Sequence, residues 1–187
     1  TIIINCFNGE SYLKEAIESV YDQTYDNWEI IFWDNHSTDD SSYIAKSFDN
    51  NLKYYLASEK TSLGEARNHA LMKATGDYVA FLDCDDLWLK HKLQSQIELL
   101  RNNENDQIGF VYGRCELFFH NKEEKSKNYK QGEILPSGEI FSLLIKENFI
   151  SFLTAIIDRK KLLECGGFPD EYMHAEDYWI FLNLSRK

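Results

Sequence analysis

The hydrophobic pattern of the first half of the chain alternates between two periods. Short β-rich runs predict strands at "TIII" (1–4), "WEIIFW" (28–33), "LKYYLA" (52–57) and "DYVAFLD" (77–83). Apolar residues at helical spacing predict helices over 12–21, 63–75 and 89–103. Strand–helix–strand units repeated in this way predict an α/β fold, with a mostly parallel sheet covered by helices on both faces.

The pattern changes from about residue 108 onward. The runs 108–113 and 115–120 predict two strands paired with each other, and the polar stretch 121–131 predicts a loop. Further along, a helix is expected over 138–149, a strand over 151–158 and a final helix over 175–187. The second half therefore adds a small antiparallel portion to the predicted sheet, and we expect one domain over 1–187.

Composition narrows the class of protein. With 187 residues and 43 % apolar side chains, the chain can bury a sizeable core. Its formal net charge of −11 and the lack of a basic stripe make a nucleic-acid partner improbable. The four cysteines show neither a CxxC pair nor zinc-ligand spacing, which favours free thiols in a reducing compartment.

The sequence contains no signal-peptide pattern and no apolar run of the length that a membrane span needs. It begins without Met and stops inside a predicted helix. We therefore expect it to be part of a longer protein, truncated at its C-terminus.

Three carboxylates, Asp83, Asp85 and Asp86, directly follow the fourth predicted strand. Crowded like charges raise one another's pKa unless a cation lies between them. Asp34 also follows a predicted strand, and ligands bind beyond the carboxyl ends of parallel strands. Hard oxygen ligands suit Mg²⁺ or Mn²⁺, which predicts a metal at this edge. Taken alone, however, such a triplet is more often a solvated turn or a helix N-cap.

The surrounding motifs resemble those of the family 2 glycosyltransferases of the GT-A fold. Their G-x-x-x-A-R-N, A-x-G and strand-D-x-D-D pattern is similar to "SLGEARNHALMKATGDYVAFLDCDDLW", although Ala66 precedes Arg67 directly and Glu65 fills the variable place. The opening "IIINCFNGESYLKEAIESVYDQTYDNWEIIFWDNHSTDD" and the closing "GGFPDEYMHAEDYWIFLNL" resemble the family's first and last blocks. The resemblance covers essentially the whole chain. It implies a nucleotide-sugar-binding half over about 1–107 and an acceptor-side half over about 108–187.

The resemblance also implies roles for individual residues. Asp34 would accept a hydrogen bond from the nucleotide base, and Arg67 would steady the nucleotide end and the neighbouring carboxylates. Asp83 would contact the ribose and share with Asp85 the binding of Mn²⁺ or Mg²⁺, with Asp85 as the principal ligand. The metal would neutralise the leaving diphosphate.

Two further residues near the start of the opening block, Phe7 and Asn8, are implied in nucleotide-sugar binding. The sequence departs from the family here, with Asn5 in place of the usual Pro and Phe7 in place of Tyr. Asn35-His36 replaces the usual Asp-Gly, so an uncharged amide stands where the family has a second carboxylate. We expect His36 to be a loop residue with an unusual backbone angle.

On the acceptor side, the family's E-D block matches Glu176 and Asp177. It implies that Asp177 is the catalytic base and Glu176 a supporting or acceptor-binding acid. By position alone, both could simply be first-turn acids that complement the helix dipole. Trp88 is a candidate for lining the sugar or acceptor site, with core packing as the alternative. Cys84 is expected to be a packed core thiol, facing away from its two acidic neighbours.

The function implied is an inverting glycosyltransferase that uses a nucleotide-diphosphate sugar, with a UDP-sugar favoured. The acceptor would be a saccharide or lipid-linked saccharide, in bacterial surface polysaccharide or glycolipid synthesis. Such a protein would be cytoplasmic, or peripheral at the inner face of the membrane.

Two alternatives remain open. One is a GT-A-like module that binds nucleotide-sugar without turnover. The other is a phosphohydrolase of the haloacid dehalogenase type, which is disfavoured because Leu87 stands where that family has Thr or Val. Its D-x-D motif also belongs on an early strand and not on the fourth.

Overall fold

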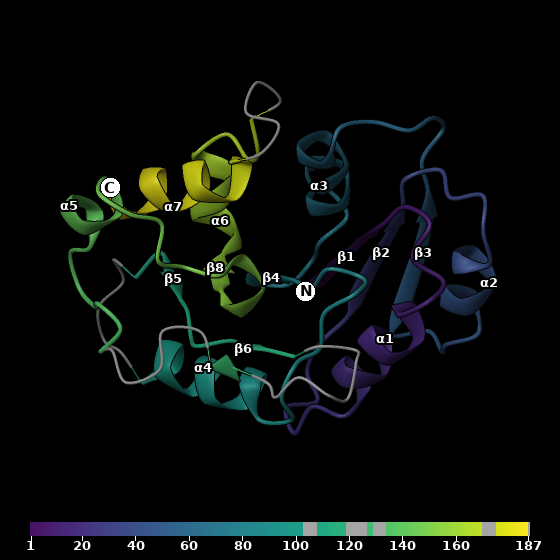
Figure 1. Cartoon of the computed structure of the whole chain (residues 1–187), viewed down its shortest axis with the longest axis horizontal. Helices are drawn as coiled ribbons and strands as arrows, with labels where there is room; N and C mark the ends of the chain where they lie inside the picture. The colour runs from purple at the N-terminus through teal and green to yellow at the C-terminus, as the bar shows by residue number, and fades with distance from the viewer. Residues whose placement is uncertain (103–107, 119–126, 129–133, 170–174, 187) are drawn as a thin grey trace.

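The computed structural model describes residues 1–102, 108–118, 127–128, 134–169 and 175–186. Its centre is a six-stranded sheet with the strand order β3-β2-β1-β4-β8-β5 (Figure 1). The first four strands along the chain are mutually parallel: β1 (Ile2–Cys6), β2 (Ile30–Asp34), β3 (Leu52–Leu56) and β4 (Tyr78–Phe81). This part of the sheet confirms the strands predicted from the hydrophobic runs.

The sheet is completed by two short strands from the second half. β8 (Ile156–Asp158) pairs antiparallel with β4 and with β5 (Phe110–Val111). The predicted pairing of 108–113 with 115–120 is therefore wrong. Because β5 pairs with β8, Phe110 packs against the core of the domain. A local hairpin of β5 with β6 would leave Phe110 exposed.

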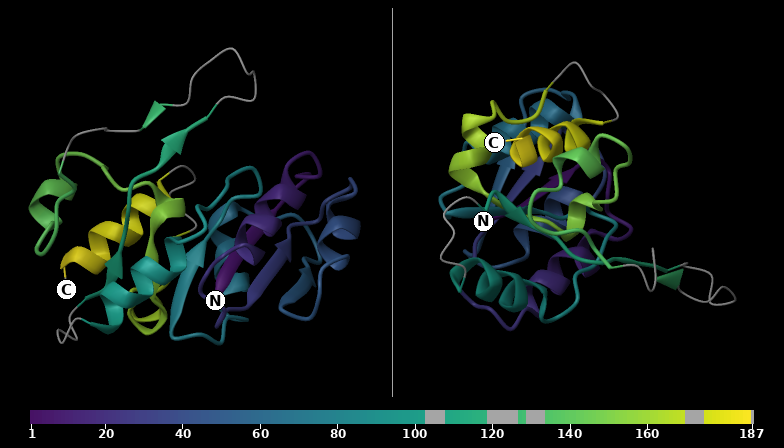
Figure 2. Two further views of the ribbon diagram at one scale, coloured as in Figure 1. Left: turned by 90° about the horizontal axis from the view of Figure 1, so that it is seen from below. Right: turned by 90° about the vertical axis from the view of Figure 1, so that its left-hand side faces the viewer.

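The other half of that predicted pair forms a separate hairpin. β6 (Glu116–Leu117) pairs with β7 (Lys127–Asn128), and this two-stranded ribbon projects away from the body of the protein (Figure 2). The predicted loop 121–131 thus contains a strand at 127–128, and the rest of it lies outside the described residues.

Helices cover both faces of the sheet, as predicted. α1 (Leu13–Tyr21) and α4 (Lys92–Arg101) lie on one face, below the sheet in Figure 1. On the other face lie α3 (Leu63–Leu71), α6 (Arg159–Glu164) and α7 (Glu176–Arg186). Two further helices are α2 (Ser41–Lys46), beside the edge strand β3, and α5 (Phe141–Leu144), which contacts α7.

Several of these elements differ from the sequence prediction. The helix expected over 138–149 is reduced to the single turn of α5, and the strand expected over 151–158 begins as a 3₁₀ turn, Phe152–Thr154. The short helices α2 and α6 were not predicted. α6 begins where the Asp158 carboxylate accepts a hydrogen bond from the Lys161 backbone N–H at 2.9 Å, a standard N-cap that follows directly on β8.

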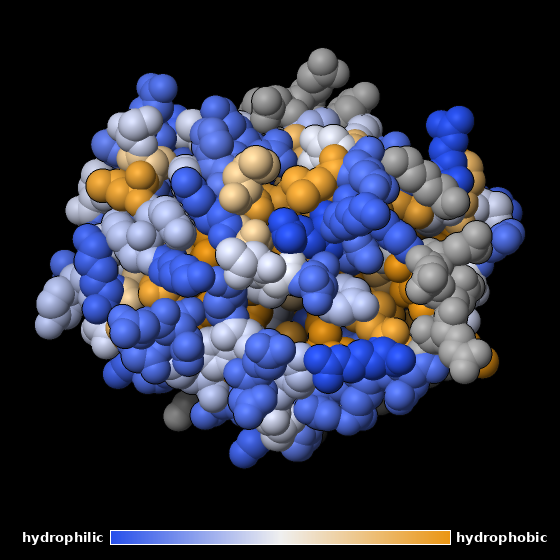
Figure 3. All heavy atoms as spheres, turned by 180° about the vertical axis from the view of Figure 1, so that it is seen from behind, coloured by the Kyte–Doolittle hydropathy of each residue, from blue (hydrophilic) through white to orange (hydrophobic). Residues whose placement is uncertain are grey.

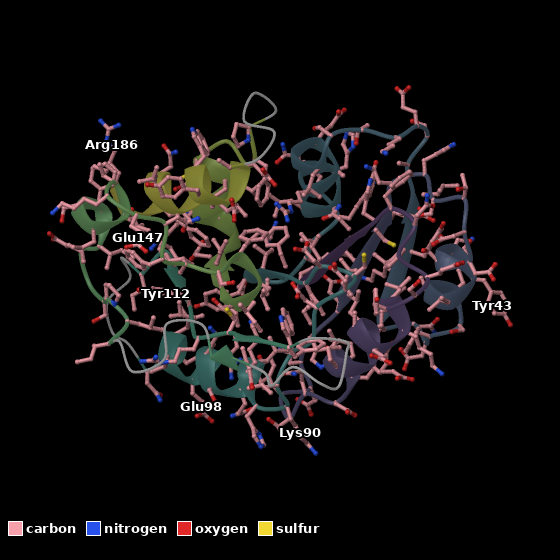
Figure 4. All side chains as sticks on the ribbon, viewed as in Figure 1. Tyr43, Lys90, Glu98, Tyr112, Glu147 and Arg186 are labelled. Carbon is pink, nitrogen blue, oxygen red and sulfur yellow. The ribbon has the colours of Figure 1, made fainter. Side chains whose placement is uncertain are left out.

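The alternation of side chains along β1 produces two hydrophobic cores. Ile2 and Ile4 face α1 and α4, whereas Ile3 faces α3 and α7. The outward faces of the covering helices are polar or exposed, as Tyr43 on α2 and Glu98 on α4 illustrate (Figure 4). From behind, hydrophilic side chains dominate the surface and apolar groups show mainly in its hollows (Figure 3). In the part of the chain that the structure describes, no helix is both long and apolar enough to cross a membrane.

Candidate functional site

The carboxyl ends of β1, β2 and β4 lie side by side. The register pairs Cys6 with Asp34 across β1 and β2, and Ile3 with Phe81 across β1 and β4. The acidic turn that follows β4 therefore emerges next to the ends of β1 and β2, as the sequence predicts for a ligand-binding edge.

The acidic turn presents its carboxylates to different environments. The Asp83 side chain is 47 % exposed, and Asp85 is exposed. Burial, reinforced by the negative charges of Asp83 and Asp85, raises the pKa of Asp86 to about 6. The turn thus carries two accessible carboxylates and a third whose charge is disfavoured by its surroundings.

Arg67 connects this turn to the beginning of α7. It is only 4 % exposed, and its guanidinium lies 2.7 Å from Glu176 Oε1 and 3.4 Å from Asp83 Oδ1. The same group is 4.5 Å from the centre of the Phe152 ring and 5.6 Å from that of Phe168. Two carboxylates and two aromatic faces thereby compensate the desolvation of this buried cation.

Arg67 therefore lies between two carboxylates, while its predicted role toward a nucleotide stays a prediction. The two ion pairs bring together Asp83 and Glu176, which are far apart in the sequence. Glu176 is 7 % exposed and committed to Arg67, so the structure favours its supporting role over a direct contact with an acceptor.

Asp177 occupies the next position in the first turn of α7 and is half-buried. Its Oδ1 accepts a hydrogen bond from the Tyr178 backbone N–H at 2.7 Å. This contact involves one carboxylate oxygen and holds the side chain near the N-terminus of α7. Arg67 contacts both Asp83 and Glu176, the residue before Asp177. The start of α7, which carries Asp177, therefore lies near the acidic turn.

Asn68, next to Arg67 on α3, has a role that the sequence reasoning did not assign. Its Nδ2 donates to the Phe168 carbonyl at 2.7 Å, and its Oδ1 accepts from the Phe168 backbone N–H at 2.8 Å. Gly64, one turn earlier, lets the backbone approach closely, because a Cβ there would lie 3.1 Å from the Pro169 carbonyl oxygen. Arg67 and Asn68 belong to a motif that is visible in the sequence, but only the tertiary structure shows which residues they contact.

Asp34 lies at the end of β2, as predicted, but its carboxylate has no exposed surface. Oδ1 accepts from the Ser37 backbone N–H at 2.7 Å, and Oδ2 accepts from the Tyr54 hydroxyl at 2.6 Å. Because the side chain is fully buried, a nucleotide base could reach this carboxylate only if the residues around it moved. The structure therefore favours Asp34 as the residue that shapes the loop after β2.

The neighbouring Asn35 fastens the same loop to the segment before α3. Its Nδ2 donates to the Thr61 carbonyl at 2.9 Å, and its Oδ1 accepts from the Thr61 backbone N–H at 3.1 Å. A carboxylate at this position could accept but not donate, so the amide suits this two-way bond. His36 has φ 70°, which confirms the unusual backbone angle expected for it.

Phe7 and Asn8 form the loop after β1. Asn8 has φ 56°, and its Oδ1 accepts from the Thr38 backbone N–H at 2.8 Å. Phe7 is exposed, with Lys60 Nζ 3.5 Å from the centre of its ring. An exposed aromatic face beside a cation is a suitable surface for a base and a phosphate, although the predicted binding role stays a prediction.

Trp88 and Cys84 both turn toward the interior. Trp88 is buried in the core between the sheet, α1 and α4, and its indole N–H donates to the Leu153 carbonyl at 3.0 Å. This environment favours core packing over contact with an acceptor. Cys84 is half-buried against the same core, in agreement with the expected packed thiol, and it is a free cysteine.

The cysteine at the end of β1 is the neighbour of Cys84. A hydrogen bond from the Cys84 thiol lowers the pKa of Cys6 to about 7 against the opposing effect of burial. The same interaction and burial raise the pKa of Cys84. The two sulfurs also border one small space, because a Cβ on Gly9 would lie 2.9 Å from the Cys6 sulfur and 2.8 Å from the Cys84 sulfur.

The acidic turn fits a divalent cation that is only partly held by the protein. Among the described residues, no three His, Cys, Asp or Glu side chains cluster closely enough to hold a metal ion by themselves. Asp83 and Asp85 offer hard oxygen ligands, however, and Mg²⁺ is commonly bound by one or two carboxylates together with substrate phosphates and waters. The residues present suit an ion whose coordination a diphosphate completes.

Comparison with known proteins gives a consistent result. The family model described as Glycosyl transferase family 2 matches residues 1–166. A relative from Escherichia coli, the UDP-Glc:alpha-D-GlcNAc-diphosphoundecaprenol beta-1,3-glucosyltransferase WfgD, is 33 % identical over 186 residues. The match covers 98 % of this chain and 68 % of that protein. Two glycosyltransferases from Rickettsia are longer, and the chain spans 31 % of each.

Solved structures share the fold. S. aureus TarS 1-349 in complex with UDP-GlcNAc superimposes with a TM-score of 0.76 at 22 % identity, covering 98 % of this chain and 52 % of that one. The mannosyltransferase PcManGT from Pyrobaculum calidifontis, in complex with GDP-Man and Mn²⁺, gives a TM-score of 0.69 at 20 % identity. That match covers 95 % of this chain and 49 % of PcManGT.

Proposed function

The chain belongs to glycosyl transferase family 2 and has the GT-A fold, and we propose that it transfers a sugar from a UDP-sugar to an acceptor hydroxyl with inversion. The observation that carries this proposal is the Arg67 bridge. It connects the carboxylates that suit a metal and a diphosphate with the start of α7, which holds a second, half-buried carboxylate. A donor site and a proton acceptor on one side of the molecule are what a direct displacement requires.

In this reaction Asp177 acts as the general base. Its carboxylate takes the proton from the acceptor hydroxyl while that oxygen bonds to the anomeric carbon of the donor sugar. The bond from the anomeric carbon to the phosphate oxygen breaks on the opposite side, and the nucleoside diphosphate leaves. The hydrogen bond that Asp177 accepts from the Tyr178 N–H restrains its side chain at the start of α7.

On the donor side, Asp83 and Asp85 would hold Mn²⁺ or Mg²⁺. When bound, the cation would neutralise the negative charge of the leaving diphosphate. Arg67 keeps Asp83 in position and adds a positive charge behind it. Phe7 and Asn8, from the loop after β1, are proposed to contact the nucleotide. Asp34 is proposed to act on the nucleotide indirectly, through the loop that it holds.

The relatives suggest the substrate class. WfgD is named for a UDP-glucose donor and an undecaprenol-diphosphate-linked acceptor, and TarS binds UDP-GlcNAc. By analogy, we propose a UDP-hexose or UDP-N-acetylhexosamine donor and a saccharide or lipid-linked saccharide acceptor. The setting would be bacterial surface polysaccharide or glycolipid synthesis, at the cytoplasmic face of the membrane. The division into a donor half (about 1–107) and an acceptor half (about 108–187) is part of this proposal.

The decisive test is a screen of nucleotide sugars with Mn²⁺, read as release of nucleoside diphosphate, followed by the Asp177→Asn variant. Because the variant lacks the base, we expect kcat to fall by roughly two to four orders of magnitude. Its affinity for UDP and metal should equal that of the parent. Glu15→Gln, which removes an exposed first-turn acid from α1, is the matched control and should keep full activity.

Two results would contradict the proposal. Normal turnover by Asp177→Asn, or loss of UDP binding in step with activity, would remove Asp177 from the role of base. Binding of UDP by the parent without transfer or hydrolysis of any donor would instead identify a nucleotide-sugar-binding module.

A further inference from the structure

Cys6 and Cys84 form a thiol pair at the candidate site. Cys6 is the last residue of β1 and is buried, while Cys84 lies between Asp83 and Asp85 and is half-buried. Both side chains belong to the core between the sheet, α1 and α4. Gly9 leaves the space for them, since a Cβ at that position would lie 2.9 Å from the Cys6 sulfur and 2.8 Å from the Cys84 sulfur.

The path of the chain brings the two cysteines together. β1 and β4 are adjacent parallel strands, with Ile3 opposite Phe81, and β4 ends at Phe81. Cys6 ends β1, and Cys84 lies in the turn that follows β4. Because both sulfurs border the position of a Cβ on Gly9, they are near neighbours in space. A disulfide requires the two sulfurs to approach to about 2.0 Å, and the turn that carries Cys84 has to move for this to happen.

We propose that Cys6 and Cys84 are a redox modification site, which a peroxide converts reversibly into a disulfide that switches off donor binding. Peroxide oxidises one thiol to a sulfenic acid and releases a water. The second sulfur then attacks the sulfenic sulfur, the S–S bond forms, and the hydroxyl leaves as a second water with the remaining thiol proton. In total, two thiols and one peroxide give one disulfide and two waters, and a dithiol reductant reverses the change.

The effect on binding follows from the position of Cys84. Asp83 and Asp85 are the residues on either side of Cys84. Movement of the Cys84 sulfur toward Cys6 therefore changes the orientation of both carboxylates. A site that depends on two carboxylates tolerates little displacement. The loss of binding rests on the proposed function, whereas the formation of the disulfide does not.

Two other free cysteines serve as internal controls. Cys115 lies just before the β6 strand, and Cys165 directly follows α6. Both are half-buried, as Cys84 is, so a general reactivity of accessible thiols would modify them as well.

The experiment exposes the reduced protein to stoichiometric hydrogen peroxide and maps the products by non-reducing peptide mass spectrometry. We expect the Cys6–Cys84 cross-link, the loss of two free thiols, and an affinity for UDP with Mn²⁺ at least tenfold lower, restored by dithiothreitol. Cys84→Ser should form no cross-link and keep its affinity under peroxide, and Cys6→Ser should do the same. The Cys115→Ser/Cys165→Ser double variant should respond like the parent.

Cross-linking of another pair, or oxidation of Cys6 and Cys84 without an S–S bond, would overturn the modification site. A Cys6–Cys84 disulfide that leaves UDP affinity unchanged would overturn the switch. If the reduced protein bound no UDP at all, the proposed function would fail, but the peptide map would still decide whether the disulfide forms.

Discussion

The two accessible carboxylates of the acidic turn are not equivalent. Asp83 lies 3.4 Å from the Arg67 guanidinium, so part of its charge is already compensated within the protein. Asp85 is exposed on the turn, and the structure gives it no such cation among its ion pairs in the described part of the chain. Asp85 is therefore the residue on which metal binding should depend most strongly.

We predict that Asp85→Asn weakens the binding of UDP in Mn²⁺ at least tenfold, because an amide oxygen replaces an anionic ligand. With EDTA, the UDP affinity of the parent should fall to that of the variant, and the UDP affinity of the variant should not fall further. Isothermal titration calorimetry of both proteins, with and without EDTA, measures the four affinities.

Asp22→Asn, an exposed change at the end of α1, serves as the control and should bind like the parent under both conditions. Undiminished UDP affinity of the parent in EDTA would show that no metal bridges the turn and the diphosphate.

At the scale of elements, α3 is the connection between the two halves of the chain. Arg67 reaches Glu176 on α7, and Asn68 holds the backbone at Phe168 through both of its amide atoms. The first residues of α7 are thereby fixed to a helix that packs on β1 and β2. The orientation of Asp177 depends on these contacts and not on propensities within α7 alone.

We predict strong energetic coupling between Arg67 and Glu176. Each single variant, Arg67→Met or Glu176→Gln, leaves a buried charge without its nearest partner and should lower the free energy of unfolding by about 3–5 kcal/mol. The double variant removes both charges, so it should be markedly more stable than the sum of the single changes implies. Urea denaturation of the four proteins gives the coupling energy.

The exposed pair of Lys14 and Glu18, 3.7 Å apart on α1, provides the comparison cycle, and its coupling should be below about 1 kcal/mol. Additive effects of the Arg67 and Glu176 changes would mean that this ion pair does not hold α7 in place.

At the scale of the whole molecule, the opposite edge of the sheet is tied together by Glu29. Its side chain is 15 % exposed and accepts hydrogen bonds from Lys53 Nζ at 2.6 Å, the Thr1 hydroxyl at 2.7 Å and the Thr75 backbone N–H at 2.8 Å. These partners lie in β3 or beside the beginnings of β1 and β4, so one carboxylate joins four parallel strands.

We predict that this contact makes stability depend on pH in the acid range. Burial raises the pKa of Glu29, but the hydrogen bonds from Lys53, Thr75 and Thr1 outweigh it and lower the pKa from 4.5 to about 2. The unfolded state therefore binds the proton more readily, and the stabilisation is complete above about pH 4.5 and is lost as the pH falls toward 2. At pH 7, Glu29→Gln should lower the free energy of unfolding by about 1.5–3 kcal/mol.

Urea titrations of the parent and the variant from pH 7 to pH 2 test this, and the difference between them should shrink across the acid window. Glu18→Gln, on the exposed face of α1, is the control and should show no such convergence. A difference that stays constant with pH would indicate that the charge of Glu29 contributes nothing.

Much of this architecture was already encoded locally. The runs of β-branched and aromatic residues defined β1 to β4, and helical spacing defined α1, α3, α4 and α7, because both signals depend only on neighbouring residues. The position of Asp83 and Asp85 directly after a strand was sufficient to predict an acidic site at the carboxyl edge of the sheet. The motif pattern around them was sufficient to indicate the family.

The tertiary structure decided which residues meet. Nothing local distinguishes the pairing of β5 with β8 from a hairpin of β5 with β6, since the competing pairings differ only in what they bury. The burial of Asp34, the ion pair of Glu176 with Arg67 and the proximity of Cys6 to Cys84 are likewise properties of the folded chain. Each depends on residues that are distant in the sequence, such as Tyr54 for Asp34. The sequence alone determined which groups could do the chemistry, while packing determined which of them remain accessible to a substrate and which hold the others in place.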